Sequence, residues 1–237
     1  MMVPQAIAAT RCLSAVRVPN GAATGGGAAL AVVLLIGLVT ADEFRLNDAL
    51  LQRVHDDYGY FARSRLIKWQ DLINQNRHRT EREKLDLVND YFNDTILAVT
   101  DRRHWKAEDY WATPVETLVT RAGDCEDFVI AKYFTLRELG VPDAHLRLTY
   151  VRALRLGEPH MVLAWYETPD ADPLVLDNVS RRIKPASERS DLVPVYSFNG
   201  ETLWMAKERG RGEAVGGPGR IARWQEVLTR MRDEGLR

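Results

Sequence analysis

Residues 111–133 read WATPVETLVTRAGDCEDFVIAKY, and the prediction of the fold starts from this segment. Cys125 follows Gly123 and Asp124. Behind it, apolar residues recur at helical spacing, at Phe128, Ala131, Phe134 and Leu139. Gly140 and Pro142 then indicate the end of the helix. Cys125 is therefore predicted at a helix N-terminus, where free backbone N–H groups and the positive end of the helix dipole favour the reactive thiolate.

Three carboxylates flank this cysteine, those of Asp124, Glu126 and Asp127. Bare negative charges beside a thiol raise its pKa and oppose the thiolate. A bound hard cation with oxygen ligands, such as calcium, would offset them, so we expect these acids to bind calcium. The alternative is that they cap the helix, where each would contribute up to about 1 kcal/mol. Both roles can hold for different residues.

The composition is that of one globular domain with terminal extensions. Of the 237 residues, 46% are hydrophobic and 27% are charged, which is enough to form a sizeable core. The formal net charge is −1, so nothing indicates nucleic acid as a partner. We expect an N-terminal segment over residues 1–41, a main domain over 42–208, and a glycine-rich linker with a short amphipathic helix over 209–237.

The first 41 residues have the pattern of an export signal. Arg11 and Arg17 precede an uncharged apolar run over residues 28–39, and the cleavage positions of a signal peptide fall at residues 39–41. The uncharged stretch over residues 21–41 is nearly long enough to span a bilayer, so an uncleaved membrane anchor is the alternative. In either case we expect the main domain to be exported.

The sequence has two cysteines, and one of them, Cys12, lies in the export segment. Cys125 is then the single cysteine of the exported domain, so it has no partner for an internal disulfide. It is a buried inert thiol, an intermolecular link or a nucleophile.

Helices are predicted in the first half of the main domain and strands in the second. Helical spacing of apolar residues predicts helices over residues 44–54, 66–73 and 85–99, and a short helix over 113–120. Capping boxes, Thr80 with Glu83 and Thr113 with Glu116, indicate two of the helix starts. Period-two patterns predict strands over residues 146–150, 160–166, 174–177, 192–198 and 201–205. This order favours an α+β fold with helices packed on an antiparallel sheet.

A predicted hairpin brings a histidine and an aspartate together. Residues 168–173 have the composition of a turn between the strands that carry His160 and Asp177. In the register that pairs the two residues directly, their side chains share a face of the sheet, whereas a shift by one residue separates them. With Cys125 they supply a nucleophile, a base and a group that orients the base, which is the minimum for acyl transfer through a thioester.

Other residues compete for these roles. The remaining histidines lie in polar or loop segments that favour surface positions: His55, His78, His104 and His145. A zinc site that contains Cys125 lacks support, because the sequence has no close pair of cysteines and no His-x-x-x-His spacing.

Residues 65–205 resemble the bacterial transglutaminase-like cysteine proteinases. The resemblance is carried by WATPVE (111–116), GDCEDF (123–128), AKY (131–133), PHM (159–161) and LDN (176–178). It implies a papain- or transglutaminase-like fold and a catalytic triad of Cys125, His160 and Asp177. It also implies that calcium is held by the acids beside the cysteine, Asp124, Glu126 and Asp127.

Within this family, the resemblance is to periplasmic proteases that release cells from biofilms. Such proteins cleave a large cell-surface adhesin near its N-terminus, at a pair of alanines. They are held inactive by an inner-membrane receptor for cyclic di-GMP, of the LapD type. The resemblance therefore implies a periplasmic, calcium-dependent thiol protease with a protein substrate and a membrane-bound inhibitor. Contact of the protease itself with the membrane would come only through an uncleaved N-terminal segment.

Two classes of function remain open at this point. One is a cysteine endopeptidase, or an acyl transferase that uses the same thioester; the other is an inactive scaffold that uses the fold to bind a partner. The complete set of Cys125, His160 and Asp177 favours the enzyme.

Overall fold

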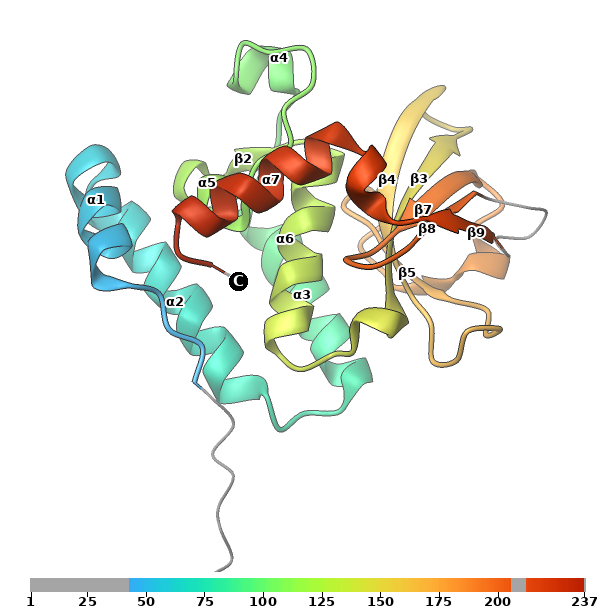
Figure 1. The fold of residues 1–237 in the computed structure, drawn as a ribbon, viewed down its shortest axis with the longest axis horizontal. Coiled ribbons are helices and arrows are strands. Elements are labelled where there is room, and N and C mark those ends of the chain that lie inside the picture. The colour runs from blue at the N-terminus through green and yellow to red at the C-terminus, as the bar shows by residue number, and fades with distance from the viewer. Residues whose placement is uncertain (1–42, 206–211, 237) are drawn as a thin grey trace, which may run out of the picture. The chain divides into compact units, whose positions relative to one another are not determined.

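The computed structural model describes residues 43–205 and 212–236. The segment predicted to direct export, residues 1–41, lies outside these ranges. Within the described residues, no helix is both long and apolar enough to cross a membrane. Helices form the first half of the described chain and a sheet forms most of the second half, as Figure 1 shows, which confirms the predicted α+β fold.

Three helices come first, α1 (Asp48–Tyr58), α2 (Tyr60–Asn76) and α3 (Glu81–Thr95). Their apolar faces belong to one core, in which Leu66, Trp69 and Phe92 are fully buried. The capping box of Thr80 and Glu83 is present at the start of α3, as predicted. Local capping therefore fixes where α3 begins, and burial of one face holds the helix in place.

The next elements lead the chain to the cysteine helix. They are β1 (Leu97–Ala98), α4 (Asp101–His104), α5 (Pro114–Thr120), β2 (Ala122–Gly123) and α6 (Cys125–Glu138). Thr113 and Glu116 form the predicted capping box of α5, which ends at Arg121 in a left-handed conformation with φ 57°. α6 packs against α3 and α5 on one side and against β3 and β4 on the other. It is thus the central helix, covered by protein on both sides.

The main sheet is antiparallel, with the strand order β6-β5-β4-β3-β7-β8-β9. Its strands are β3 (Leu146–Ala153), β4 (Glu158–Trp165), β5 (Leu174–Leu176), β6 (Lys184–Pro185), β7 (Leu192–Phe198), β8 (Leu203–Met205) and β9 (Glu213–Gly216). Leu148 and Leu163 face the helices and are fully buried, whereas Val151 and Val162 form a smaller cluster apart from that core. The central strands β3 and β4 are therefore apolar on both faces.

The C-terminal segment differs from the expectation of a free linker. Residues 213–216, inside the predicted linker, form β9, which pairs with β8. The pairing requires close backbone approach, because a Cβ atom at Gly212 would lie 2.7 Å from the carbonyl oxygen of Met205. Glycine at this position therefore serves packing rather than flexibility.

The last helix, α7 (Ala222–Asp233), belongs to the same core as the rest of the domain. Trp224 is fully buried, and its ring lies 5.4 Å from that of Phe134 on α6, in a stacked arrangement. The rings of Tyr133 and Phe198 contact it edge-on, at 5.7 Å and 5.3 Å. The amphipathic helix predicted from the sequence is thus docked on α6 and β7.

A buried lysine connects α6 to α3 and to the loop after β5. Lys132 is completely buried, and its Nζ donates hydrogen bonds to Asn89 Oδ1 and Asn93 Oδ1, both at 2.9 Å, and to the backbone oxygen of Asp177 at 3.3 Å. All three donors of the ammonium group are therefore used. Burial nevertheless lowers the pKa of Lys132 to about 7.

Replacement of the buried tryptophan tests the docking of α7. Trp224→Ala should lower the free energy of unfolding by about 3–5 kcal/mol, because a large aromatic side chain is removed from a filled core. Urea unfolding measures the loss. The control, Arg232→Ala at an exposed position of the same helix, should stay within about 0.5 kcal/mol of the wild type. Equal stability of Trp224→Ala and the control would contradict this packing.

The buried lysine predicts a pH dependence of stability. Below about pH 7 both the folded and the unfolded chain carry the charge, and the cost of burying it is present in full. Between about pH 7 and pH 10 the unfolded chain holds a proton that the folded chain has released, so the wild type should become more stable relative to Lys132→Met. The slope should reach up to about 1.4 kcal/mol per pH unit.

Chemical unfolding across this pH range measures the difference. Lys68→Met, at an exposed position of α2, is the matched control and should show a difference that does not change with pH. A difference between wild type and Lys132→Met that stays constant or falls as the pH rises would contradict the lowered pKa of this lysine.

Candidate active site

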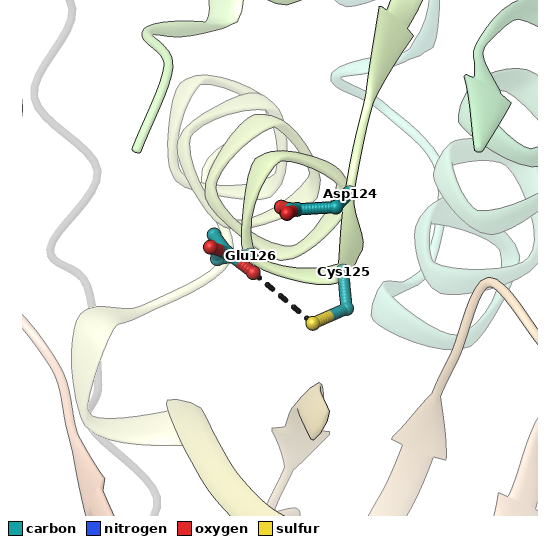
Figure 2. A group of neighbouring side chains, drawn as sticks. All are labelled: Asp124, Cys125 and Glu126. Carbon is teal, nitrogen blue, oxygen red and sulfur yellow. Dashed lines mark hydrogen bonds between the residues drawn. The ribbon is translucent and has the colours of Figure 1, made fainter. Parts of the chain in front are cut away.

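Cys125 is the first residue of α6, which confirms its predicted place at a helix N-terminus. Gly123 precedes it at the end of β2, where a Cβ atom would lie 2.5 Å from Asp127 Oδ2, so a larger residue would displace the start of the helix. The thiol donates a 3.1 Å hydrogen bond to Glu126 Oε2, as Figure 2 shows. The backbone N–H of Met161, on β4, also interacts with the sulfur.

The surroundings of this thiol oppose its ionisation. Burial, followed by the charge and the hydrogen bond of Glu126, raises the pKa of Cys125, and the N–H group of Met161 offsets these effects only in part. The helix N-terminus alone therefore does not produce the thiolate that the sequence suggested. The negative charge of the neighbouring acids must be offset for the sulfur to become a nucleophile.

His160 and Asp177 are hydrogen-bonded to each other, as the hairpin predicted. The distance from His160 Nε2 to Asp177 Oδ1 is 2.9 Å, and both side chains are buried. The contact is diagonal rather than directly across the ladder, because β4 and β5 pair Leu163 with Leu176. Continuing this register places Asp177 opposite Val162, two residues from His160 and on the same face.

The carboxylate of Asp177 accepts two further hydrogen bonds. The backbone N–H of Val179 donates to Oδ1 at 2.9 Å, and Nη2 of Arg189 donates to Oδ2 at 2.8 Å. Burial alone would raise the pKa of Asp177, but the hydrogen bonds from His160, Val179 and Arg189 outweigh it and hold the pKa well below its ordinary range. Asp177 is therefore a carboxylate in the folded protein.

Cys125 lies next to β4, at the residue that follows His160 on that strand. The sulfur of Cys125 interacts with the backbone of Met161, the residue that follows His160. Because Nε2 of His160 is used by Asp177, the ring nitrogen left for a thiol is Nδ1. His160 and Asp177 also line a cavity of about 300 Å³ together with residues of the loops after β3 and β5.

Acidic side chains cluster around the start of α6. Ligand oxygens of Asp101, Asp124 and Asp127 lie within 4.8 Å of one another, and so do those of Asp101, Asp109 and Glu126. Oδ1 of Asp101 and Oδ1 of Asp124 are buried and have no hydrogen-bond partner within the described part of the chain. Carboxylate oxygens in this arrangement are the ligands that calcium prefers.

The charges of the cluster repel one another. Burial, followed by the charge of Glu126, raises the pKa of Asp124 to about 9. Burial also raises the pKa of Glu126, of Asp127 and of Asp101. Without a positive charge nearby, these carboxyl groups are harder to ionise than ordinary acids, so the cluster as a whole favours a bound cation.

The three acids predicted as metal ligands differ in their roles. Asp127 is completely buried, and its two oxygens accept hydrogen bonds from the backbone N–H groups of Ala112, at 2.7 Å, and Asp124, at 3.2 Å. With Asp124 it forms the capping box of α6. The capping role proposed as the alternative thus applies to Asp127 and Asp124, which also belong to the acid cluster, whereas Glu126 contributes to the cluster alone.

Sequence reasoning did not identify three residues of this region. Asp101 and Asp109 lie between the helices predicted over residues 85–99 and 113–120, and Arg189 lies between the strands predicted over 174–177 and 192–198. For the first two there was no clear signal, because residues 101–109 contain three acids and three basic residues, Arg102, Arg103 and Lys106. For Arg189 there was none, because a lone arginine in a polar loop is usually solvated.

The other histidines are placed away from this constellation. His104 Nε2 lies 3.0 Å from the hydroxyl of Thr120, and His145 Nδ1 lies 2.9 Å from Glu81 Oε2. His55 and His78 are exposed on the helical layer. Among the described residues, His160 is therefore the histidine that is paired with a buried carboxylate beside the cysteine helix.

Comparisons with known proteins agree with this arrangement. The family model of the bacterial transglutaminase-like cysteine proteinases matches residues 67–206. LapG from Legionella pneumophila matches with 41% identity and a TM-score of 0.67, and the match covers 76% of this chain and 95% of LapG. A search of curated proteins finds no match.

Two further structures of the same Legionella pneumophila protein also match. The EGTA-treated form has 41% identity and a TM-score of 0.68, over 76% of this chain and 95% of LapG. The calcium-bound form has 42% identity and a TM-score of 0.67, over 76% and 97%. With the family model covering more than half of the sequence, the chain belongs to the bacterial transglutaminase-like cysteine proteinases and is a cysteine protease of that family.

Proposed function

We propose that this protease is a calcium-dependent endopeptidase in which Cys125 is the nucleophile, His160 the general base and Asp177 the residue that orients the base. The observation that carries the proposal is the 2.9 Å hydrogen bond between two buried side chains, from His160 Nε2 on β4 to Asp177 Oδ1 just after β5. A carboxylate on Nε2 fixes the tautomer in which Nδ1 can accept a proton from the thiol.

The reaction divides into two acyl transfers. The sulfur of Cys125 attacks the carbonyl carbon of the scissile bond, its proton passes to His160 Nδ1, and His160 returns that proton to the leaving amine. A thioester remains on the sulfur. His160 then takes a proton from water while the water oxygen attacks the thioester carbon. The C–S bond breaks, the carboxylic acid product leaves, and His160 returns the proton to the sulfur. In both steps Asp177 stabilises the imidazolium that forms.

The acid cluster fits a calcium ion. Asp101 offers oxygens near those of Asp124 and Asp127 and near those of Asp109 and Glu126. Oδ1 of Asp101 and Oδ1 of Asp124 are buried without a partner in the described chain. When bound, calcium supplies positive charge that lowers the pKa values of the surrounding acids and removes their opposition to the thiolate. Asp124 and Glu126 flank Cys125, so residues that hold the ion also fix the position of the nucleophile.

The calcium-bound and EGTA-treated forms of LapG support this proposal, because they show that a protein with 42% identity binds calcium. The similarity also supports a function in biofilm release. We propose that the substrate is the N-terminal region of a large surface adhesin, that the protease works in the periplasm after export, and that a cyclic di-GMP receptor of the LapD type inhibits it. The export pattern in residues 1–41 agrees with that location.

Substitution of the proposed triad tests the catalytic assignment. Cys125→Ala should abolish cleavage of adhesin N-terminal fragments, and His160→Ala or Asp177→Asn should each lower kcat by about 10⁴-fold or more. The His160→Ala/Asp177→Asn double variant should be little worse than either single variant, because the two residues act as a unit. Gel-based cleavage assays measure the rates, and thermal unfolding shows that each variant is folded. Full activity of Cys125→Ala would exclude the assignment.

Removal of the metal tests the acid cluster. Chelator should stop cleavage reversibly, and calcium should restore it better than magnesium, because magnesium demands a tighter octahedral shell. Asp124→Ala and Asp101→Asn should each weaken calcium binding by about 10-fold or more in calorimetry. Glu108→Gln is the matched control, since Glu108 is an exposed acid of the same segment that pairs with Arg102. Cleavage at an unchanged rate in chelator, without measurable calcium binding, would leave these acids as helix caps.

A further inference from the structure

An arginine contacts the orienting aspartate through the carboxylate oxygen that His160 does not use. Arg189 lies in the loop before β7, twelve residues from Asp177, and only 6% of its surface is exposed. Its Nη2 donates to Asp177 Oδ2 at 2.8 Å, while His160 and Val179 use Oδ1. One carboxylate oxygen therefore binds the imidazole of His160, and the other binds the guanidinium of Arg189.

Arg189 is itself held in place by a second carboxylate. Nε donates to Asp191 Oδ1 and Nη2 donates to Asp191 Oδ2, both at 3.0 Å. The planar guanidinium is thus fixed by a bidentate contact on one edge and directs the remaining hydrogen of Nη2 at Asp177. A side chain that only filled space would not need this geometry.

We propose that Arg189 is a positioning residue for the reaction, which holds Asp177 ionised and aligned with His160, and that Asp191 keeps Arg189 in position. This inference rests on the proposed function of Asp177. Arg189 touches neither the cysteine nor, in the proposed mechanism, the substrate. Its effect on the reaction passes through Asp177 to the tautomer and orientation of the His160 ring.

Arg189 differs from the two nearby lysines because it donates to the side-chain carboxylate of Asp177. Lys132 approaches Asp177 from the helical side but bonds its backbone oxygen. Lys184 lines the same cavity and lies 4.0 Å from Glu188, with which it pairs. Within the described chain, the hydrogen bonds to the carboxylate itself come from His160, Val179 and Arg189 alone. Loss of Arg189 therefore leaves Oδ2 buried without a donor.

The test compares Arg189→Met, Arg189→Lys and a control, Arg181→Met, in the full exported domain. Arg181 is an exposed arginine of the loop after β5 and pairs with Asp94. Arg189→Met should lower kcat about 10–100-fold with KM unchanged, because only orientation of the base is lost. Arg189→Lys should have a higher kcat than Arg189→Met, because an ammonium group keeps the positive charge. It should stay below the wild type, because it lacks the planar, bidentate donors of the guanidinium. Arg181→Met should match the wild type.

Nitrogen and proton NMR of the His160 ring supply a readout that a merely structural role would not change. In the wild type the ring proton should sit on Nε2 and resonate far downfield, and in Arg189→Met this signal should weaken or vanish although the protein stays folded. An unchanged signal together with an unchanged kcat would overturn the proposal. If the wild type cleaves none of the fragments offered, the proposed function fails, and the NMR comparison still decides whether Arg189 orients the pair.

Discussion

A charged carboxylate with no exposed surface is the constraint around which this domain is built. The side chain of Asp177 is fully buried, so hydrogen-bond donors of the protein, not water, must stabilise its negative charge. Four separate segments supply contacts: β4 gives His160, the loop after β5 gives the N–H of Val179, the loop before β7 gives Arg189, and α6 gives Lys132 to the backbone oxygen. The aspartate therefore links the sheet, its connecting loops and the central helix.

The start of α6 presents the opposite situation. Here Asp101, Asp124 and Glu126 bring negative charges together, and the described chain supplies no guanidinium or ammonium group in hydrogen-bond contact with any of them. The charge of Asp177 is balanced by protein donors, whereas the carboxyl groups beside Cys125 have no such cationic partner in the described chain. In the proposed mechanism, this difference keeps the base in a fixed position while the reactivity of the nucleophile depends on a bound cation.

The local signals in the sequence predicted more than the long-range ones. Capping boxes at Thr80 and Thr113 and the helix start at Cys125 depend on a few neighbouring residues, and the structure confirms them. The hairpin also placed His160 beside Asp177, because a short turn limits the possible registers, although the true contact is diagonal. Arg189 could not be found, since polar loops have no periodicity that reports where a side chain points.

Long-range contacts also explain the C-terminal segment. Its glycine-rich composition predicted a linker, but part of it pairs with β8 and the helix that follows packs on the core. Trp224 closes the core over α6, and Arg223 donates to Asp109 Oδ2 at 3.2 Å, on the acid cluster. Glu234 accepts a 2.7 Å hydrogen bond from the hydroxyl of Thr113. The preceding residue, Ala112, donates its backbone N–H to Asp127. α7 lies beyond the residues that the family model matches, yet its contacts reach both the acid cluster and the segment that anchors the start of the cysteine helix. In the proposed mechanism, α7 and its C-terminal cap therefore support the segments on which the start of the cysteine helix rests.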